Sequence, residues 1–256
     1  MSLVLPTFSG FVQPASGGAY ENLLSGSFDG TDDKLSIPTN TFNLGDGLFS
    51  FSLWFNADSL NSYNVLFAVG KASGSTFRCT GWIRDNGDIA LSNWSNDQLT
   101  SSGNTIATST WHHLAYVKST TGAAGTITIY FNGSSVASGP IPSTGSDFGS
   151  ENEASAIGDS ITGYYTFDGK IDEFAFWNSA LSASDITAIY NSGVPADISS
   201  LSPVNWYRMG DGTGDTESGG GAPASGDTIG TVVNQGSGSN NATGTNGPTY
   251  SDSVPS

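Results

Sequence analysis

The sequence predicts an all-β protein, an antiparallel β-sandwich with one short helix. Apolar and polar residues alternate with a period of two along several segments, and turn residues separate these segments. The chain has 256 residues and 34 glycines, a number that suits the many turns of a multi-stranded protein. Hydrophobic residues make up 36% of the chain, so it can form a core.

The clearest strand covers residues 49–55. Every second residue from Phe49 to Phe55 is large and apolar, which predicts a half-buried strand with one apolar face. Residues 126–131 alternate in the same way, and Asn132-Gly133 predicts a hairpin turn because both residues tolerate positive φ. Further strands are expected at 65–69, 76–83, 88–92, 111–117, 134–137, 154–157 and 170–177.

One short helix is expected after residue 181. Ser182 is a good N-cap, and Asp185 stands three residues later, where its carboxylate can reach back to the cap. Ile186 begins the apolar face. Gly193 can supply a left-handed turn at the end of the helix, and Pro195 prevents its continuation.

Six short motifs follow one another along residues 27–193: Ser27-Phe28-Asp29-Gly30-Thr31-Asp32-Asp33, Phe51-Ser52-Leu53-Trp54-Phe55, Trp111-His112-His113-Leu114-Ala115, Ile127-Thr128-Ile129-Tyr130-Phe131-Asn132-Gly133, Phe167-Asp168-Gly169-Lys170-Ile171-Asp172-Glu173-Phe174 and Ala180-Leu181-Ser182-Ala183-Ser184-Asp185-Ile186. Their order resembles that of the laminin-G-like modules of the concanavalin-A-like lectin and glucanase superfamily. The resemblance implies that the sandwich is a jelly roll. A shared fold does not by itself specify a function.

The C-terminal part departs from that family pattern. The segment Trp206-Tyr207-Arg208-Met209-Gly210-Asp211-Gly212 is similar to the first strand of such modules, which stands at the other end of the chain. We therefore expect this part to pair within the same sandwich, as after a circular permutation, with a separate tail as the alternative. Short strands are expected at 201–209, 231–234 and 241–250, with a loop at 210–230. The expected division is an N-terminal arm at 1–25, the sandwich at 26–195 and the docking segment at 196–256.

Catalysis is not expected. A glycosidase needs two carboxylates on either side of the scissile bond, and related glucanases carry Glu-x-Asp-x-x-Glu on one strand. The nearest match is the segment 168–173, in which Asp172 and Glu173 are adjacent and should point to opposite faces of a strand. Glu151 and Glu153 have the right spacing, but they lie in a Ser/Gly/Asn-rich stretch without an aromatic platform.

Other catalytic and metal motifs are also missing from the sequence. His112 and His113 are neighbours, so they should face opposite ways on a strand and cannot chelate one metal ion. Cys79 is the single cysteine, which rules out an intrachain disulfide and a cysteine zinc cluster. The start of the chain has no basic segment followed by a long apolar run, so no signal peptide and no membrane span are expected.

The resemblance implies calcium as a ligand. Many modules of this family hold one ion at the rim of the sandwich, and the matching positions here are Asp29, Asp32, Asp33 and Asp172. Carboxylate oxygens are suitable calcium ligands. The alternative is that Asp29 and Asp172 only accept hydrogen bonds from backbone amides in tight turns.

Five aromatic residues are not all explained by the core pattern, and they are the candidates for glycan binding: Tyr63, Trp82, Trp94, Tyr164 and Tyr165. Flat aromatic faces stack on the apolar faces of sugar rings, and nearby amides and acids bind the hydroxyls. Trp94 is the best candidate because its loop, Ser92-Asn93-Trp94-Ser95-Asn96-Asp97, is polar. The alternative for each aromatic is a packing role.

The negative net charge argues against two classes of partner. The formal charge of −16 repels phosphate backbones and anionic lipids, so neither nucleic acid nor a membrane is expected as a partner. Few lysines and abundant Ser, Thr, Asn and Gly make the composition similar to that of structural proteins of marine bacteriophages.

Three functions follow from these observations. The first is a non-enzymatic glycan-binding adhesion module, displayed on a virion surface or another extracellular assembly. The second is an assembly protein, a capsid decoration or fibre component that contacts other virion proteins. The third is a glycosidase. Clustered exposed aromatics beside acids would favour the first, and a continuous apolar patch would favour the second. The apolar N-terminal arm, with Phe8, Phe11 and Val12, predicts a homo-oligomer.

Overall fold

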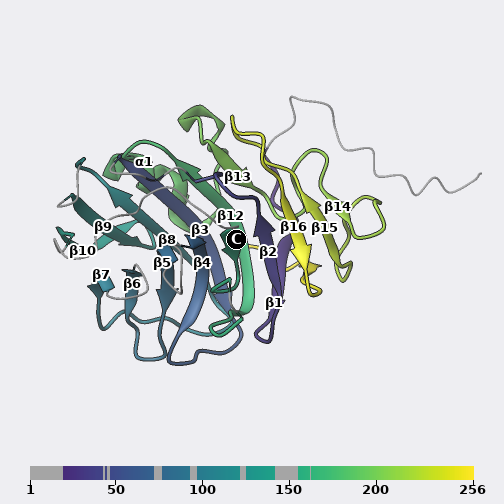
Figure 1. The fold of residues 1–256 in the computed structure, drawn as a ribbon, viewed down its shortest axis with the longest axis horizontal. Helices are drawn as coiled ribbons and strands as arrows, with labels where there is room; N and C mark the ends of the chain where they lie inside the picture. The colour runs from purple at the N-terminus through teal and green to yellow at the C-terminus, as the bar shows by residue number, and fades with distance from the viewer. Residues whose placement is uncertain are drawn as a thin grey trace, which may run out of the picture.

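The computed structural model describes residues 20–42, 44, 47–71, 77–92, 97–121, 125–141, 155–161 and 163–256. Two antiparallel sheets form a sandwich with one short α-helix, which confirms the predicted fold class (Figure 1). The strands of the first sheet are β10 (Ser134–Pro140), β9 (Thr126–Phe131), β8 (Trp111–Lys118), β3 (Phe49–Ala57), β12 (Asp168–Trp177), β1 (Ser25–Asp29) and β17 (Thr249–Ser251), in that order, with β13 (Asn205–Tyr207) also paired to β12.

The second sheet packs against the first. Its strands are β14 (Thr216–Glu217), β15 (Ile229–Val232), β16 (Ala242–Thr245), β2 (Lys34–Ile37), β11 (Ser155–Ile157), β4 (Asn64–Lys71), β5 (Phe77–Ile83), β6 (Ile89–Ser92) and β7 (Asp97–Ser101), in that order. Aromatic rings from the two sheets interlock in the core between them. The ring of Phe67 on β4 lies 4.7 Å from Phe51 on β3 and 5.5 Å from Phe174 on β12, measured between centroids.

Strand β3 is buried on both faces, so the prediction of a half-buried strand is wrong. All nine of its residues are buried. The second face is covered because Trp54 stacks on Tyr190 of α1 (Ala183–Tyr190), with ring centroids 5.8 Å apart, and Ser50 hydrogen-bonds the segment that leads into the helix. Sequence alternation shows which side chains are apolar, but it does not show whether another element covers the opposite face.

The helix begins as predicted. Ser182 accepts a hydrogen bond from the backbone N–H of Asp185, and the Asp185 carboxylate accepts one from the N–H of Ser182, which completes a capping box. The end differs from the expectation in one detail. Asn191, with φ +43°, is the left-handed cap, and Gly193 lies two residues further on.

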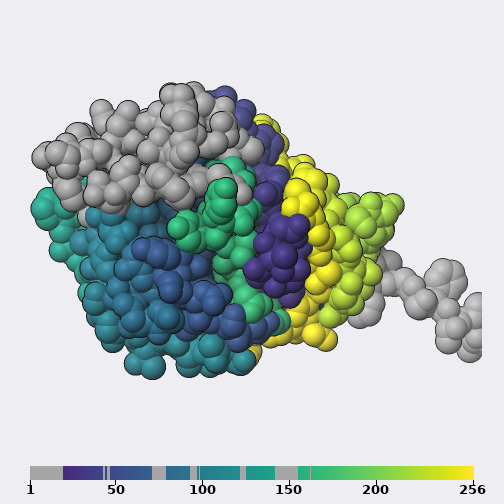
Figure 2. All heavy atoms as spheres, turned by 60° about the horizontal axis from the view of Figure 1, so that its bottom comes forward, coloured from purple at the N-terminus to yellow at the C-terminus, as the bar shows by residue number. Residues whose placement is uncertain are grey.

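The C-terminal segment is hydrogen-bonded into both sheets. Strand β13 pairs with β12, β17 pairs with β1, and β16 pairs with β2. Figure 2 shows the end of this segment, in yellow, lying directly against the purple N-terminal strands. The expected long strand at 201–209 is shorter, because a 3-10 turn occupies Ser199–Leu201, and the expected loop at 210–230 contains β14 and the start of β15.

The N-terminal arm lies almost entirely outside the described residues, including Phe8, Phe11 and Val12. Its last residues, Tyr20–Leu24, are described and contact the C-terminal segment, and β1 starts at Ser25. Within the described part of the chain, no helix is both long and apolar enough to cross a membrane.

Candidate functional site

Two loops form an open hollow of about 330 Å³ at one end of the sandwich. The β3–β4 connection contributes Asn61, Ser62 and Tyr63, and the β11–β12 connection contributes Tyr164, Tyr165 and Thr166. Tyr164 is 81% exposed, Tyr63 41% and Tyr165 36%. Three exposed aromatic rings in one hollow are unusual on a protein surface that is otherwise rich in small polar residues, and they suggest a binding site.

The first loop is held by a buried asparagine. The Asn64 side chain is fully buried, and its amide nitrogen donates to the carbonyls of Asn61 (2.8 Å) and Ile83 (3.1 Å). Its side-chain oxygen accepts the N–H of Asn61 at 3.0 Å. Because both ends of this amide are satisfied, the loop has a fixed shape before any ligand arrives.

The second loop is held by a buried aspartate. Asp159 has no exposed surface, and it accepts from Lys34 Nζ at 3.0 Å and from the N–H of Gly163 at 3.1 Å. Ile161 adopts φ +71°, a left-handed conformation that a β-branched residue rarely takes. Strain of this kind is common in loops that bind ligands, and here Asp159 and the packing of Ile161 under the loop maintain it.

The aromatic rings contact one another. The Tyr63 ring lies 5.2 Å from Tyr165 and 5.4 Å from Trp82, measured between centroids. Arg84 lies under this group, with its guanidinium carbon 4.0 Å from the Trp82 ring and 4.5 Å from the Tyr63 ring, and it donates to the Tyr63 hydroxyl at 3.0 Å. The cation fixes the orientation of Tyr63 and leaves Tyr164 free to meet a ligand.

The structure thus brings together four of the five aromatics predicted from sequence. Tyr63, Tyr164 and Tyr165 line the hollow. Trp82 is only 3% exposed and donates from Nε1 to Ser92 Oγ at 3.0 Å, so it supports Tyr63 from below and offers no face to a ligand. Trp94 lies outside the described residues.

Sequence reasoning missed the polar part of this site. Asn61, Ser62 and Thr166 line the hollow, while Asn64 and Asp159 fix the two loops. The pair Asn61 and Asn64 carries a usable signal, because asparagines commonly hold tight turns by bonding the backbone nearby. No comparable local pattern identifies Asp159, whose partner Lys34 is 125 residues away in the chain.

The predicted calcium ligands separate into two places. Atoms of Asp29, Asp32 and Asp33 that could bind a metal lie within 4.8 Å of one another. However, Asp29 Oδ1 accepts the N–H of Thr31 at 2.8 Å, and Asp33 Oδ2 accepts the N–H of Asp29 at 3.0 Å. With one ligand atom each, the three side chains supply three of the six to eight oxygens of a calcium shell, and two of the carboxylates already accept hydrogen bonds that close the turn, so the fit is incomplete.

Asp172 does not join this acidic group, so its assignment to the same metal site is wrong. Strand β1 pairs with β12 so that Asp29 faces Asp168 and Gly26 faces Ile171. Asp172 is therefore four residues away from Asp168 along the strand, about 13 Å at the usual rise per residue. Calcium binding by the remaining three aspartates stays a prediction.

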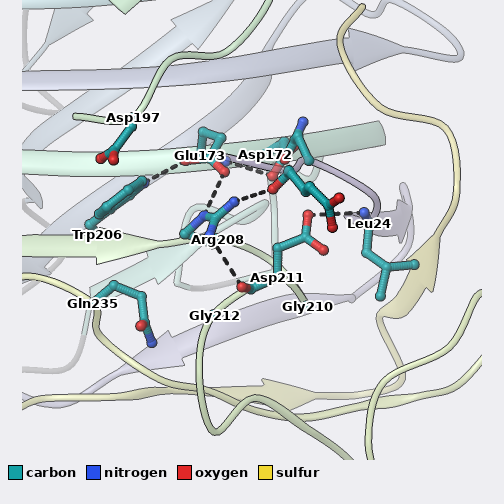
Figure 3. A network of polar contacts seen from close by, with 12 residues as sticks. Leu24, Asp172, Glu173, Asp197, Trp206, Arg208, Gly210, Asp211, Gly212 and Gln235 are labelled. Atoms are coloured by element: carbon teal, nitrogen blue, oxygen red, sulfur yellow. Dashed lines mark hydrogen bonds and ion pairs between the residues drawn. The ribbon is translucent and has the colours of Figure 1, made fainter. Parts of the chain in front are cut away.

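Asp172 and Glu173 instead share one polar network, shown in Figure 3, and the prediction that they point apart is wrong. Asp172 faces Trp54 and Ala175 faces Ser52, so the two residues between them on β12 oppose a single residue of β3. This is a β-bulge, and Glu173 takes φ +51° within it. A bulge resets the alternation of side chains, which sequence spacing cannot reveal.

This network links three segments of the chain through hydrogen bonds (Figure 3). Glu173 accepts from Trp206 Nε1 at 2.5 Å and from Arg208 Nε at 3.2 Å. Asp172 accepts from Asn22 Nδ2 at 2.8 Å, and Asp211 accepts the backbone N–H of Leu23 and Leu24 at 2.7 and 3.1 Å. The arrangement joins the end of the N-terminal arm, β12 and the C-terminal segment.

The electrostatics of the acid pair fit a structural role. Burial, together with the adjacent Glu173 carboxylate, raises the pKa of Asp172 well above its usual value. Burial also raises the pKa of Glu173, and the nearby Arg208 guanidinium offsets part of this rise. Both acids are buried and bonded to protein donors, so the network stabilises the join between segments. Glu151 and Glu153, the other acids weighed for catalysis, lie outside the described residues.

The two histidines face opposite sides of β8. His113 is fully buried on the helix-covered face, where its Nε2 lies 2.8 Å from Ser52 Oγ. His112 lies on the other side, with its ring 5.0 Å from that of Phe131. Both histidine side chains therefore pack against neighbouring strands of the sandwich.

Comparison with known proteins agrees with the architecture. The profile of the laminin-G-type family described as the concanavalin A-like lectin/glucanases superfamily matches residues 29–187, which is more than half of the chain. The chain belongs to this superfamily. The match ends before the C-terminal segment, whose strands nevertheless pair with those of the matched region. No curated protein sequence matches the chain.

Solved structures of this superfamily's fold include proteins connected with carbohydrates. A proposed carbohydrate binding protein from Bacteroides ovatus has a TM-score of 0.62 at 18% identity, over 92% of this chain and 62% of the other. The CBM40 of the Ruminococcus gnavus IT-sialidase has a TM-score of 0.50 at 12% identity, over 66% and 98%. A Trypanosoma rangeli sialidase also reaches 0.50, at 15% identity, over 67% and 27%. This chain therefore spans less than two thirds of the Bacteroides protein, and at these identities the likeness concerns the fold.

Proposed function

We propose that the protein is a non-enzymatic carbohydrate-binding module that holds a glycan in the hollow between the β3–β4 and β11–β12 loops. The observation that carries this proposal is the gathering of Tyr63, Tyr164 and Tyr165, all exposed, around one open hollow. Structures of similar fold that are described as carbohydrate binding support it, although they share less than 20% identity with this chain.

The chemistry of the lining suits a sugar. The exposed Tyr164 ring can stack on the C–H face of a pyranose or furanose ring, where its apolar area is buried without loss of a polar contact. The Asn61 amide and the Ser62 hydroxyl can exchange hydrogen bonds with sugar hydroxyls. The Thr166 hydroxyl, which donates its proton to the Gly30 carbonyl, can accept one. Because the two loops are already held by Asn64 and Asp159, little conformational entropy is lost on binding.

A glycan array tests this proposal. Wild-type protein is expected to bind at least one glycan, and Tyr164→Ala is expected to bind it about tenfold more weakly, because one stacking face is lost. Val194→Ala is a matched control, since Val194 is a 46% exposed apolar residue that does not line the hollow. The array is run with and without Ca²⁺ to test the calcium prediction separately. Equal binding by the two variants would refute the site.

The exposed surface favours sugar binding over an assembly role. Among the described residues, the exposed large hydrophobic side chains are Leu23, Tyr63, Tyr164, Tyr165 and Val194, and three of these five line the hollow. A structural assembly protein would be expected to show a continuous apolar patch instead. Display on a virion or another extracellular assembly, and formation of a homo-oligomer, stay predictions.

A further inference from the structure

We propose that the hollow selects glycans without carboxylate or sulfate groups, an inference that rests on the proposed carbohydrate-binding function. The first support for this selectivity is the chemistry of the residues that line the hollow. The described residues that line the hollow all have uncharged side chains, namely Asn61, Ser62, Tyr63, Tyr164, Tyr165 and Thr166. Amides and hydroxyls both donate and accept hydrogen bonds, which matches the hydroxyls of a neutral sugar.

The cation beneath the hollow is already neutralised. Arg84 Nη1 lies 3.4 Å from Asp88 Oδ2, and Arg84 Nη2 lies 3.6 Å from Asp97 Oδ2. Its plane is covered by the Tyr63 and Trp82 rings, and its side chain is 23% exposed. An anionic sugar would have to compete with two carboxylates of the protein for this one guanidinium.

The two lysines that support the loops are paired in the same way. Lys34 Nζ lies 3.0 Å from the carboxylate of Asp159, the buried residue that holds the β11–β12 loop. Lys170 Nζ lies 2.9 Å from Asp58 at the start of the other loop. Neither lysine therefore presents an unmatched positive charge to a ligand in the hollow.

The surroundings of the hollow add negative charge. Thr166 Oγ1 donates to the carbonyl of Gly30 at 2.5 Å, which places the acidic turn of Asp29, Asp32 and Asp33 beside the β11–β12 loop. The whole chain carries a formal charge of −16. An acidic sugar would lose part of its hydration in the hollow, and the described residues around it offer no unpaired cation in return. The negative charge of the protein would also repel it.

Matched pairs of glycans test the selectivity by isothermal titration calorimetry. The probes are lactose with sialyllactose, methyl-esterified with free oligogalacturonides, and neutral with sulfated galactan oligosaccharides. For every backbone that binds, we expect the acidic form to bind at least tenfold more weakly at low salt, and we expect the difference to shrink at high salt. An acidic form that binds as tightly as its neutral partner would overturn the selectivity. If no backbone binds in either form, the carbohydrate-binding function itself fails, and the selectivity fails with it.

One substitution gives a second, independent measurement. Asp97→Asn removes one of the two carboxylates that neutralise Arg84, and its side chain is 35% exposed, so folding should tolerate the change. The affinity for the acidic form is expected to rise severalfold, while the affinity for the neutral form stays unchanged. Asp252→Asn is the matched control, because it removes an exposed acid that does not contact Arg84. Equal effects of the two substitutions would show that net charge alone, and not the pairing of Arg84, sets the preference.

Discussion

Removal of residues 196–256 is expected to abolish the cooperative unfolding transition of the remaining chain. The deletion takes away β13, β16 and β17, and so exposes the edges of β12, β2 and β1. It also removes Trp206 and Arg208 from Glu173, which leaves a buried carboxylate without its cation. Breaking such a buried pair alone typically costs about 3–5 kcal/mol. Thermal unfolding followed by circular dichroism is the measurement.

A point substitution in the C-terminal segment predicts how much stability this segment contributes. Tyr207 has no exposed surface, its ring stacks on Phe174 with centroids 6.3 Å apart, and its hydroxyl donates to the carbonyl of Asn240 at 2.7 Å. Tyr207→Ala is expected to lower the free energy of unfolding by about 3–5 kcal/mol, as for other large aromatic residues in cores. Tyr207→Phe keeps the ring but loses two hydrogen bonds, the one that the hydroxyl donates to Asn240 and the one that it accepts from Asn205 Nδ2, so its expected cost is about 1–3 kcal/mol. A truncated chain, or a Tyr207→Ala variant, with wild-type stability would show that the C-terminal segment is a separate tail.

Acid is expected to destabilise the protein through His113. Burial lowers the pKa of this histidine to about 3, so it stays neutral in the folded protein, while the unfolded chain takes up the proton below about pH 6.5. The stabilisation is therefore complete above pH 6.5 and is lost as the pH falls toward 3. The loss is about 2 kcal/mol at pH 5 and about 4 kcal/mol near pH 3.

The histidine effect must be separated from buried acids that act the other way. Burial raises the pKa of Asp215 to about 6, so its contribution is greatest below about pH 4 and is lost as the pH rises past 6. Comparison of wild type with His113→Gln isolates the histidine, because Asp215 is present in both. Denaturant unfolding at pH 7.5 and pH 5 should show a smaller loss of stability for His113→Gln by about 2 kcal/mol. Equal losses in the two proteins would contradict the account.

The sequence predicts the local features of this fold well and the long-range ones poorly. The capping box at Ser182 and the Asn132-Gly133 turn each depend on residues close together in the chain, and both form, the turn with φ +47° and +76°. The two-sided burial of β3 and the bulge at Glu173 depend on how distant elements meet. No local pattern distinguishes a strand covered on one face from a strand covered on both.

The candidate site shows the same division. Tyr63, Tyr164 and Tyr165 could be selected from sequence because they do not fit the core alternation. These tyrosines surround one hollow because β11 pairs with β4, which brings together two loops that lie about 100 residues apart in the chain. The separation of Asp172 from Asp29 follows from the register of β12 against β1, which sequence spacing does not define.

The most direct test of the central claim is a crystal structure of the protein with the neutral oligosaccharide that binds most tightly. The account predicts a sugar ring against the exposed face of Tyr164, with its hydroxyls hydrogen-bonded to Asn61 or Thr166. A sugar bound elsewhere on the sandwich, with the hollow between Tyr63 and Tyr164 free of it, would contradict the assignment of this site.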